Sequence, residues 1–183
     1  IEDAYDEELR KLSGRGKTLL FDDVIRIPLL ISGTNVPHGS SEQQVRQIDI
    51  FPTLSELGNF STTIQKINGK SLVPLLNNQV FSEEPAYIET GSSNSKILGK
   101  LIGIRTSNYK YLRSRDQKIE TIILYDLKND ENETKNIASS NPKIVEKMEK
   151  MLEVIRDNSN IDDSVIISEE QSKEIEEELK KLG

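Results

Sequence analysis

The spacing of apolar residues changes several times along this chain, and each spacing predicts a different element. The run at 24–32 is apolar almost without interruption, which predicts a strand from Ile27 to Ser32 that is buried on both faces of a sheet. Residues 51–58 repeat apolar side chains every three positions and end at a glycine, which predicts a short helix with Pro52 in first place. A single helical turn is expected at 69–76.

The second half of the chain has two other patterns. Four short segments, PAYIET, KLIGIRT, YKYLR and TIILYDL, lie between 85 and 127 at hairpin-like spacing and predict a small antiparallel sheet. From Pro142, apolar side chains recur on one helical face, which predicts a long amphipathic helix. Weaker helical stripes occur at 1–12 and from Ser168.

Composition limits the classes of protein that fit these patterns. The 183 residues suffice for one domain with a modest core, and no apolar run approaches the length of a membrane helix, so a soluble chain without a span is expected. The net charge of −7 disfavours nucleic acid as a partner. Residues 140–183 hold 7 basic and 12 acidic side chains, so the acidity is concentrated there.

The residues that could carry chemistry are few. The chain has no cysteine, and His38 is its only histidine, a candidate acid, base or ligand in a loop that also fits a plain surface turn. Asp22 and Asp23 are hard oxygen donors that could hold a cation, although such a pair more often caps a strand or faces water. Arg26 is expected to form a scaffold ion pair with Asp22, Asp23 or Asp49.

Other polar residues favour structural roles. Asp49 has the spacing of a helix cap before Pro52. The acidic turn from Asp126 to Glu133 is interpreted as a connection between sheet and helix. Tyr109 and Tyr111 should share one face of a strand, with Lys110 on the other; stacking on a sugar is possible for the tyrosines, and sheet packing is favoured.

The order of five segments carries more information than any one of them. The strings GKTLLFDDVIRIPLLISG, QIDIFPTLSELG, INGKSLVPLL, IGIRTSNYKYLR and LYDLKNDENETKNIA follow one another with spacing that resembles the C-terminal half of the sulfatase family, in the alkaline phosphatase superfamily. The similarity covers roughly residues 14–156. It implies an α/β, alkaline-phosphatase-like fold, of which this chain holds the C-terminal part, with the Ile27–Ser32 strand completing a large sheet that the missing half contributes.

The resemblance also says what to look for in an active site. Sulfatases use a formylglycine made from Cys or Ser in a Cys/Ser-x-Pro-Ser-Arg motif, with a divalent metal, usually calcium, held by carboxylates upstream. Ser140 and Pro142 belong to the nearest similar string, which lacks the arginine. We therefore expect nucleophile and metal to belong to a full-length enzyme, and no cofactor in this part. Lys17 matches a lysine that contacts the sulfate group or its leaving oxygen.

The sequence thus predicts part of a metal-dependent hydrolase of small-molecule or glycan sulfate esters, or of related phosphate or phosphonate esters, inactive alone. The expected divisions are the α/β core at 1–84, the small sheet with its helix at 85–157, and an acidic helix or tail at 158–183. The alternatives are a non-enzymatic interaction module, whose two C-terminal helices, from Pro142 and from Ser168, bind a partner or self-associate, and a degenerate sulfatase-like binding domain. Compartment and oligomeric state stay open.

Overall fold

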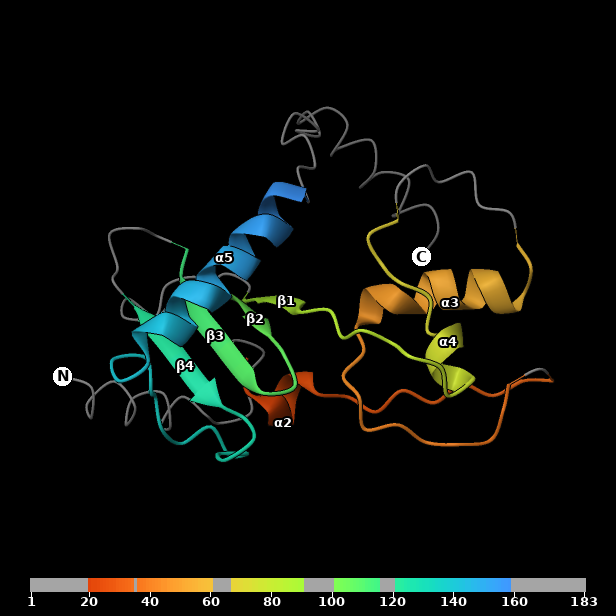
Figure 1. The fold of residues 1–183 in the computed structure, drawn as a ribbon, viewed down its shortest axis with the longest axis horizontal. Helices are drawn as coiled ribbons and strands as arrows, with labels where there is room; N and C mark the ends of the chain where they lie inside the picture. The colour runs from red at the N-terminus through yellow and green to blue at the C-terminus, as the bar shows by residue number, and fades with distance from the viewer. Residues whose placement is uncertain (1–19, 35, 61–66, 91–100, 116–120, 159–183) are drawn as a thin grey trace, which may run out of the picture.

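The computed structural model describes residues 20–34, 36–60, 67–90, 101–115 and 121–158 of the chain. The expected helices at 1–12 and from Ser168, and the candidate residue Lys17, lie outside these residues. Figure 1 shows two groups of elements side by side, one built on a sheet and the other on short helices.

The small sheet that the sequence predicts between 85 and 127 is confirmed. Its four strands are antiparallel and pair in the order in which they occur in the chain. The strands are β1 (Ala86–Glu89), β2 (Leu101–Arg105), β3 (Tyr109–Ser114) and β4 (Ile122–Asp126). Both faces of the central strands β2 and β3 are buried, so side chains that alternate along each strand enter two apolar layers, one on each face of the sheet.

One layer lies under helix α5 (Pro142–Asn158), which crosses the sheet in Figure 1. Met148 and Leu152 of this helix are buried against strand residues such as Ile104 and Tyr111. The opposite layer contains Leu101, Leu112, Ile123, Tyr125 and Leu127, with Leu20 and Phe21 packed against it. We call the sheet, α5 and residues 20–25 the sheet lobe.

Residues 26–80 form what we call the helical lobe. Its elements are α3 (Ile50–Leu57), which follows the 3-10 turn η1 (Gln47–Asp49), and the single turn α4 (Val73–Leu76). The Thr53 hydroxyl donates to the Asp49 carbonyl at 2.5 Å and accepts the Leu72 N–H at 2.9 Å, so a buried threonine joins α3 to the segment before α4. Pro52 is the third helical residue instead of the first.

The expected buried strand from Ile27 to Ser32 is not formed in the described residues, which do not include the main sheet that it was expected to complete. The helical turn α2 (Asp22–Ile25) precedes the segment, and residues 26–32 have no regular structure. Ile27 is 72% exposed and Leu30 is 90% exposed. The physical reason is the lack of a neighbour: every strand pair of the described residues belongs to the small sheet, so nothing offers this segment a hydrogen-bonded edge.

Candidate functional site

A buried lysine is the centre of the most unusual polar site in the described structure. Lys110 is the second residue of β3 and lies between Tyr109 and Tyr111, which pack on the α5 side of the sheet, so strand alternation directs the lysine to the opposite face. The residue is 0% exposed. An ammonium group in such a place requires opposite charge, because the cost of removing it from water is several kcal/mol.

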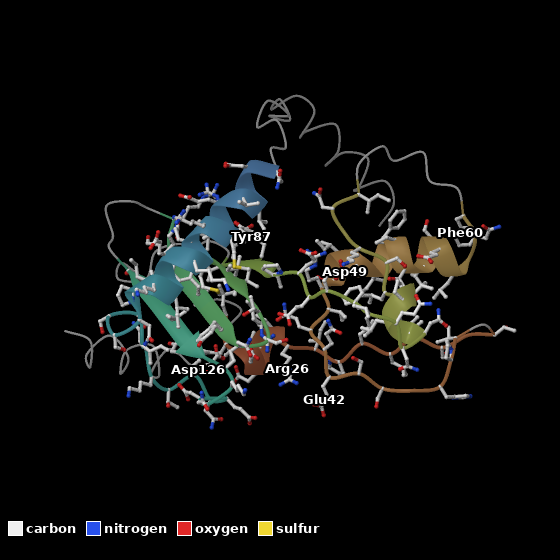
Figure 2. All side chains as sticks on the ribbon, in the orientation of Figure 1. Arg26, Glu42, Asp49, Phe60, Tyr87 and Asp126 are labelled. Atoms are coloured by element: carbon white, nitrogen blue, oxygen red, sulfur yellow. The ribbon has the colours of Figure 1, made fainter. Side chains whose placement is uncertain are left out.

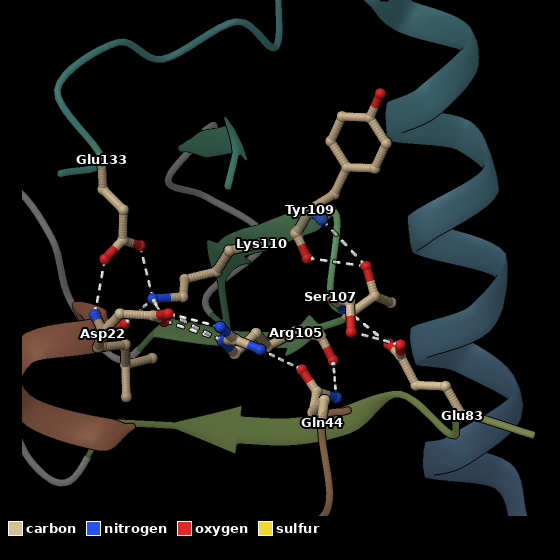
Figure 3. Close-up of polar contacts among 10 residues, drawn as sticks. Asp22, Gln44, Glu83, Arg105, Ser107, Tyr109, Lys110 and Glu133 are labelled. Atoms are coloured by element: carbon tan, nitrogen blue, oxygen red, sulfur yellow. Dashed lines mark hydrogen bonds and ion pairs between the residues drawn. The ribbon is translucent and has the colours of Figure 1, made fainter. Parts of the chain in front are cut away.

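Two carboxylates supply that charge (Figure 3). Lys110 Nζ lies 2.6 Å from Asp22 Oδ1 and 2.5 Å from Glu133 Oε1, and it donates to the Leu20 carbonyl at 2.8 Å. These partners come from segments far apart in the chain: Leu20 and Asp22 precede the sheet, and Glu133 follows it. The lysine therefore holds the segment before the sheet and the segment after it against the same face of the sheet.

Asp22 is shared between two cations. Arg105, at the end of β2, donates to its carboxylate from Nε at 2.9 Å and from Nη2 at 2.5 Å. Burial alone would raise the pKa of Asp22, but the hydrogen bonds and charges of Arg105 and Lys110 outweigh it and lower the pKa from 3.8 to about 2. Asp22 is consequently ionised in the folded protein at any pH near neutrality.

Glu133 completes what we call the charged cluster: Asp22, Arg105, Lys110 and Glu133. Its backbone has a φ of 52°, in the left-handed region that costs a non-glycine residue roughly 1 kcal/mol or more. Its Oε2 accepts the backbone N–H of Asp22 at 2.6 Å. Burial raises the pKa of Glu133, and the neighbouring Lys110 charge only partly offsets this. The strained backbone is thus held in place by side-chain contacts.

Two cations and two carboxylates in mutual contact balance one another, so the cluster has no uncommitted base or nucleophile. Its chemistry is that of fixed charges that hold chain segments together. Sequence reasoning missed Arg105, Lys110 and Glu133 as a group. The sequence did indicate one member of the group, because the predicted alternation of β3 placed Lys110 on the face of the strand opposite the two tyrosines.

The candidates predicted from the sequence do not meet in space in the described residues. His38 is exposed in a bend, and Asp23, unlike its neighbour Asp22, is exposed. The expected partners of Arg26 are engaged elsewhere: Asp22 pairs with Arg105 and Lys110, and Asp49 pairs with Arg46. Within the described part of the chain no ion pair joins Arg26 to Asp22, Asp23 or Asp49, so the expected scaffold ion pair is not formed there.

No group of three or more His, Asp or Glu side chains among residues 20–158, apart from the gaps in that range, could hold a metal ion. The described acidic turn after β4 uses its oxygens locally: Asp126 accepts the Lys128 N–H, and Asp130 accepts the N–H groups of Thr134 and Lys135. The divalent metal that the resemblance implies does not fit these residues.

A cleft of about 390 Å³ lies between the turn that joins β2 to β3 and the first half of α5. Tyr109, Met148 and Met151 line it, with Glu83 and Lys147 among its polar residues, and His38 is not part of it. Glu83 is already engaged, since it accepts the Ser107 N–H at 2.6 Å. In the described helices, none is long and apolar enough to cross a membrane.

The described residues form a small antiparallel sheet with a helix on one face and a charged cluster on the other, and comparison with known proteins identifies the family to which this module belongs. Residues 15–158 match the family described as N-sulphoglucosamine sulphohydrolase, C-terminal. The chain belongs to the sulfatase family, as its C-terminal portion.

Individual relatives agree with this placement. The chain is 30% identical to Arylsulfatase K of Danio rerio over 155 residues, which are 81% of this chain and 29% of that protein. It is 26% identical to a sulfatase of Formosa agariphila, covering 69% of this chain and 25% of that one. The solved structure of a 2-O GAG sulfatase superposes with a TM-score of 0.52 at 26% identity, over 62% of this chain and 25% of that chain. The chain thus spans less than a third of the length of these relatives.

Proposed function

We propose that this chain is the C-terminal part of a metal-dependent hydrolase of sulfate esters, with phosphate or phosphonate esters as the related alternative, and that it is inactive alone. The observation that carries the proposal is the family match over residues 15–158, which includes every described element of both lobes. Nucleophile and metal ligands would belong to the portion of the enzyme that its relatives have beyond the matched region. Calcium is the metal we propose there.

The distribution of apolar surface supports this proposal. The large apolar side chains that are exposed lie mostly in the helical lobe, as Figure 2 shows for Phe60 at the end of α3. The set in or next to this lobe is Val24, Ile27, Leu29, Leu30, Ile48, Phe51, Leu54, Phe60 and Val80. Apolar surface on this scale is typical of an interface. We propose that the rest of the hydrolase covers it, with residues 1–84 belonging to the α/β core.

Lys17 is the residue of this chain that we propose to act on the substrate. A sulfate ester gains negative charge on its oxygens as the S–O bond breaks, and a fixed ammonium group stabilises that charge. His38 is not proposed for this role, because it lies exposed in a bend. Sulfated glycans are the favoured substrate class, since the 2-O GAG sulfatase shares the fold at 26% identity.

The test compares the 183-residue chain with the complete enzyme on 4-nitrophenyl sulfate and on a sulfated disaccharide, with calcium. We expect turnover from the complete enzyme alone. In it, Lys17→Ala lowers kcat, whereas Lys135→Ala, at an exposed site, leaves kcat unchanged. Robust turnover by the 183-residue chain would contradict its proposed dependence on the remainder. A complete enzyme that cleaves neither sulfate nor phosphate esters would refute the function.

The alternative of an interaction module rests on the apolar stripe of α5. In the structure, Met148 is 3% exposed and Leu152 is 0% exposed, because both pack against the sheet. The apolar side chains of α5 that a partner protein would have to contact are therefore already packed against the sheet of this chain. This observation favours the hydrolase proposal over helix-in-groove binding through α5.

A further inference from the structure

The described helices and strands of one lobe make no extensive contact with those of the other. The chain passes between them at 25–26 and again at 80–86, and every extensive contact between described elements lies within one lobe or the other. Two connections without a shared apolar core would leave the lobes free to turn about the connecting segments. Something else must therefore set their orientation in the structure.

Polar side chains contact across the junction: Lys70 of the helical lobe donates to Ser82 Oγ in the second connection at 2.7 Å, and Arg105 of the sheet lobe contacts groups in both lobes (Figure 3). Its Nε and Nη2 hold Asp22 of the sheet lobe, while its Nη1 donates to the Oε1 of Gln44, which belongs to the helical lobe. Gln44 returns the contact, since its Nε2 donates to the Arg105 carbonyl at 3.0 Å. The amide of Gln44 is thus held by the side chain and the backbone of Arg105, with a longer contact of 3.4 Å from its Nε2 to the Glu84 carbonyl.

The other members of the charged cluster keep Arg105 in place. Lys110 contacts the Asp22 carboxylate, and Glu133 accepts the backbone N–H of Asp22, so the residue that receives the guanidinium is itself held in place. A guanidinium is planar and presents its donors in a rigid fork, so fixing two of its nitrogens also fixes the direction of the third. That third nitrogen faces Gln44.

We infer that Arg105 is a positioning residue that sets the orientation of the helical lobe, and of its exposed apolar side chains, relative to the sheet lobe. Gln44 is the matching group on the helical lobe. A neighbouring contact, from Gln43 Nε2 to the Phe81 carbonyl at 2.8 Å, fastens the same loop to the second connection. The inference goes beyond the proposed function, because it concerns the geometry of this chain and requires no hydrolysis.

The test measures the distance between the lobes in the 183-residue chain. The sequence has no cysteine, so nitroxide labels can be placed at two introduced cysteines without removing any native one. Glu56→Cys on α3 and Glu153→Cys on α5 use exposed positions, one in each lobe. Double electron–electron resonance then gives the distribution of distances between the labels.

We expect one narrow distribution in the otherwise unchanged chain. Gln44→Leu, which removes the amide, and Arg105→Lys, which keeps the charge and loses the fork, should each broaden the distribution about twofold. Gln47→Leu is the matched control, because it changes an exposed glutamine three positions further on, and it should leave the distribution narrow.

Circular dichroism of each variant separates orientation from unfolding. Gln44→Leu leaves no buried charge unpaired, so its thermal midpoint should stay close to that of the unchanged chain while its distance distribution broadens. A distribution that remains narrow in both Gln44→Leu and Arg105→Lys would overturn the inference. A distribution that is already broad in the unchanged chain, or equally broad in the Gln47→Leu control, would overturn it as well.

Discussion

Replacing Lys110 by methionine tests whether the charged cluster stabilises the sheet lobe. Methionine keeps the length of the buried stem and removes the ammonium group that contacts Asp22, Glu133 and the Leu20 carbonyl. Removing one partner of a buried ion pair costs about 3–5 kcal/mol, because the remaining charge stays buried without a counterion. We expect Lys110→Met to lower the free energy of unfolding by that amount at pH 7.

The loss should depend on pH, and its sign follows from Glu133. Burial already raises the pKa of this carboxyl, and losing the lysine charge raises it further. A raised carboxyl pKa means that the folded state holds the proton more tightly than the unfolded state, so that stability is gained as pH falls through the folded pKa. The deficit of Lys110→Met should therefore be smaller at pH 5 than at pH 7.

Urea unfolding followed by circular dichroism at both pH values measures this effect. The double variant Lys110→Met with Glu133→Gln should recover much of the loss, because it removes the unpaired charge. Lys150→Met is the matched control: it breaks the exposed pair with Glu146 on α5 and should leave unfolding nearly unchanged. A deficit below about 1 kcal/mol, or one equal at pH 5 and pH 7, would refute the reasoning.

Three further predictions use the same unfolding measurement. Leu152→Ala empties a fully buried position and should cost about 2–5 kcal/mol, whereas Val154→Ala, 58% exposed, should cost far less; equal losses would contradict the packing of α5. Gly103→Ala places a Cβ 1.9 Å from a backbone oxygen of β3 and should disrupt the sheet, while Gly39→Ala meets nothing within 4 Å and should be tolerated. The pKa of Asp22 is lowered to about 2, so its ionised carboxylate contributes about 2 kcal/mol to the free energy of unfolding above pH 4, and this contribution is lost as pH falls toward 2. An Asp22→Asn variant whose free energy of unfolding depends on pH below 4 as that of the unchanged chain does would argue against this.

The sheet could be predicted from sequence because each strand pairs with the strand next to it in the chain. Alternating residues in β2, β3 and β4 bury two layers, and short connections leave antiparallel pairing as the simple solution. The Ile27–Ser32 segment has equal apolar character and no such neighbour. Apolar character predicts that a segment will be buried, but it does not identify the surface that buries it, so the predicted strand is not formed in this chain alone.

The charged cluster was harder to predict because its members lie far apart in the chain. Asp22 and Lys110 were each noted for a local reason, one as a possible cation ligand and the other for its face of the strand. Asp49 shows the same limit at shorter range: its carboxylate accepts the N–H groups of Arg46 and Lys70, so it caps η1 in place of the helix predicted after it. The spacing of residues along the sequence indicates that a side chain can donate or accept a hydrogen bond. Which group it contacts is decided by the folded structure.

The sequence separations within the cluster have a consequence for the order of folding. Asp22 and Glu133 are 111 positions apart, and Asp22 and Arg105 are 83 apart, whereas β2, β3 and β4 follow one another through short connections. Closing long loops costs more chain entropy than closing hairpins, so the sheet is expected to form before Asp22 reaches its cations. Interactions made after the rate-limiting step act on the unfolding rate. The buried charges would then leave the speed of folding almost unchanged and lengthen the lifetime of the folded chain.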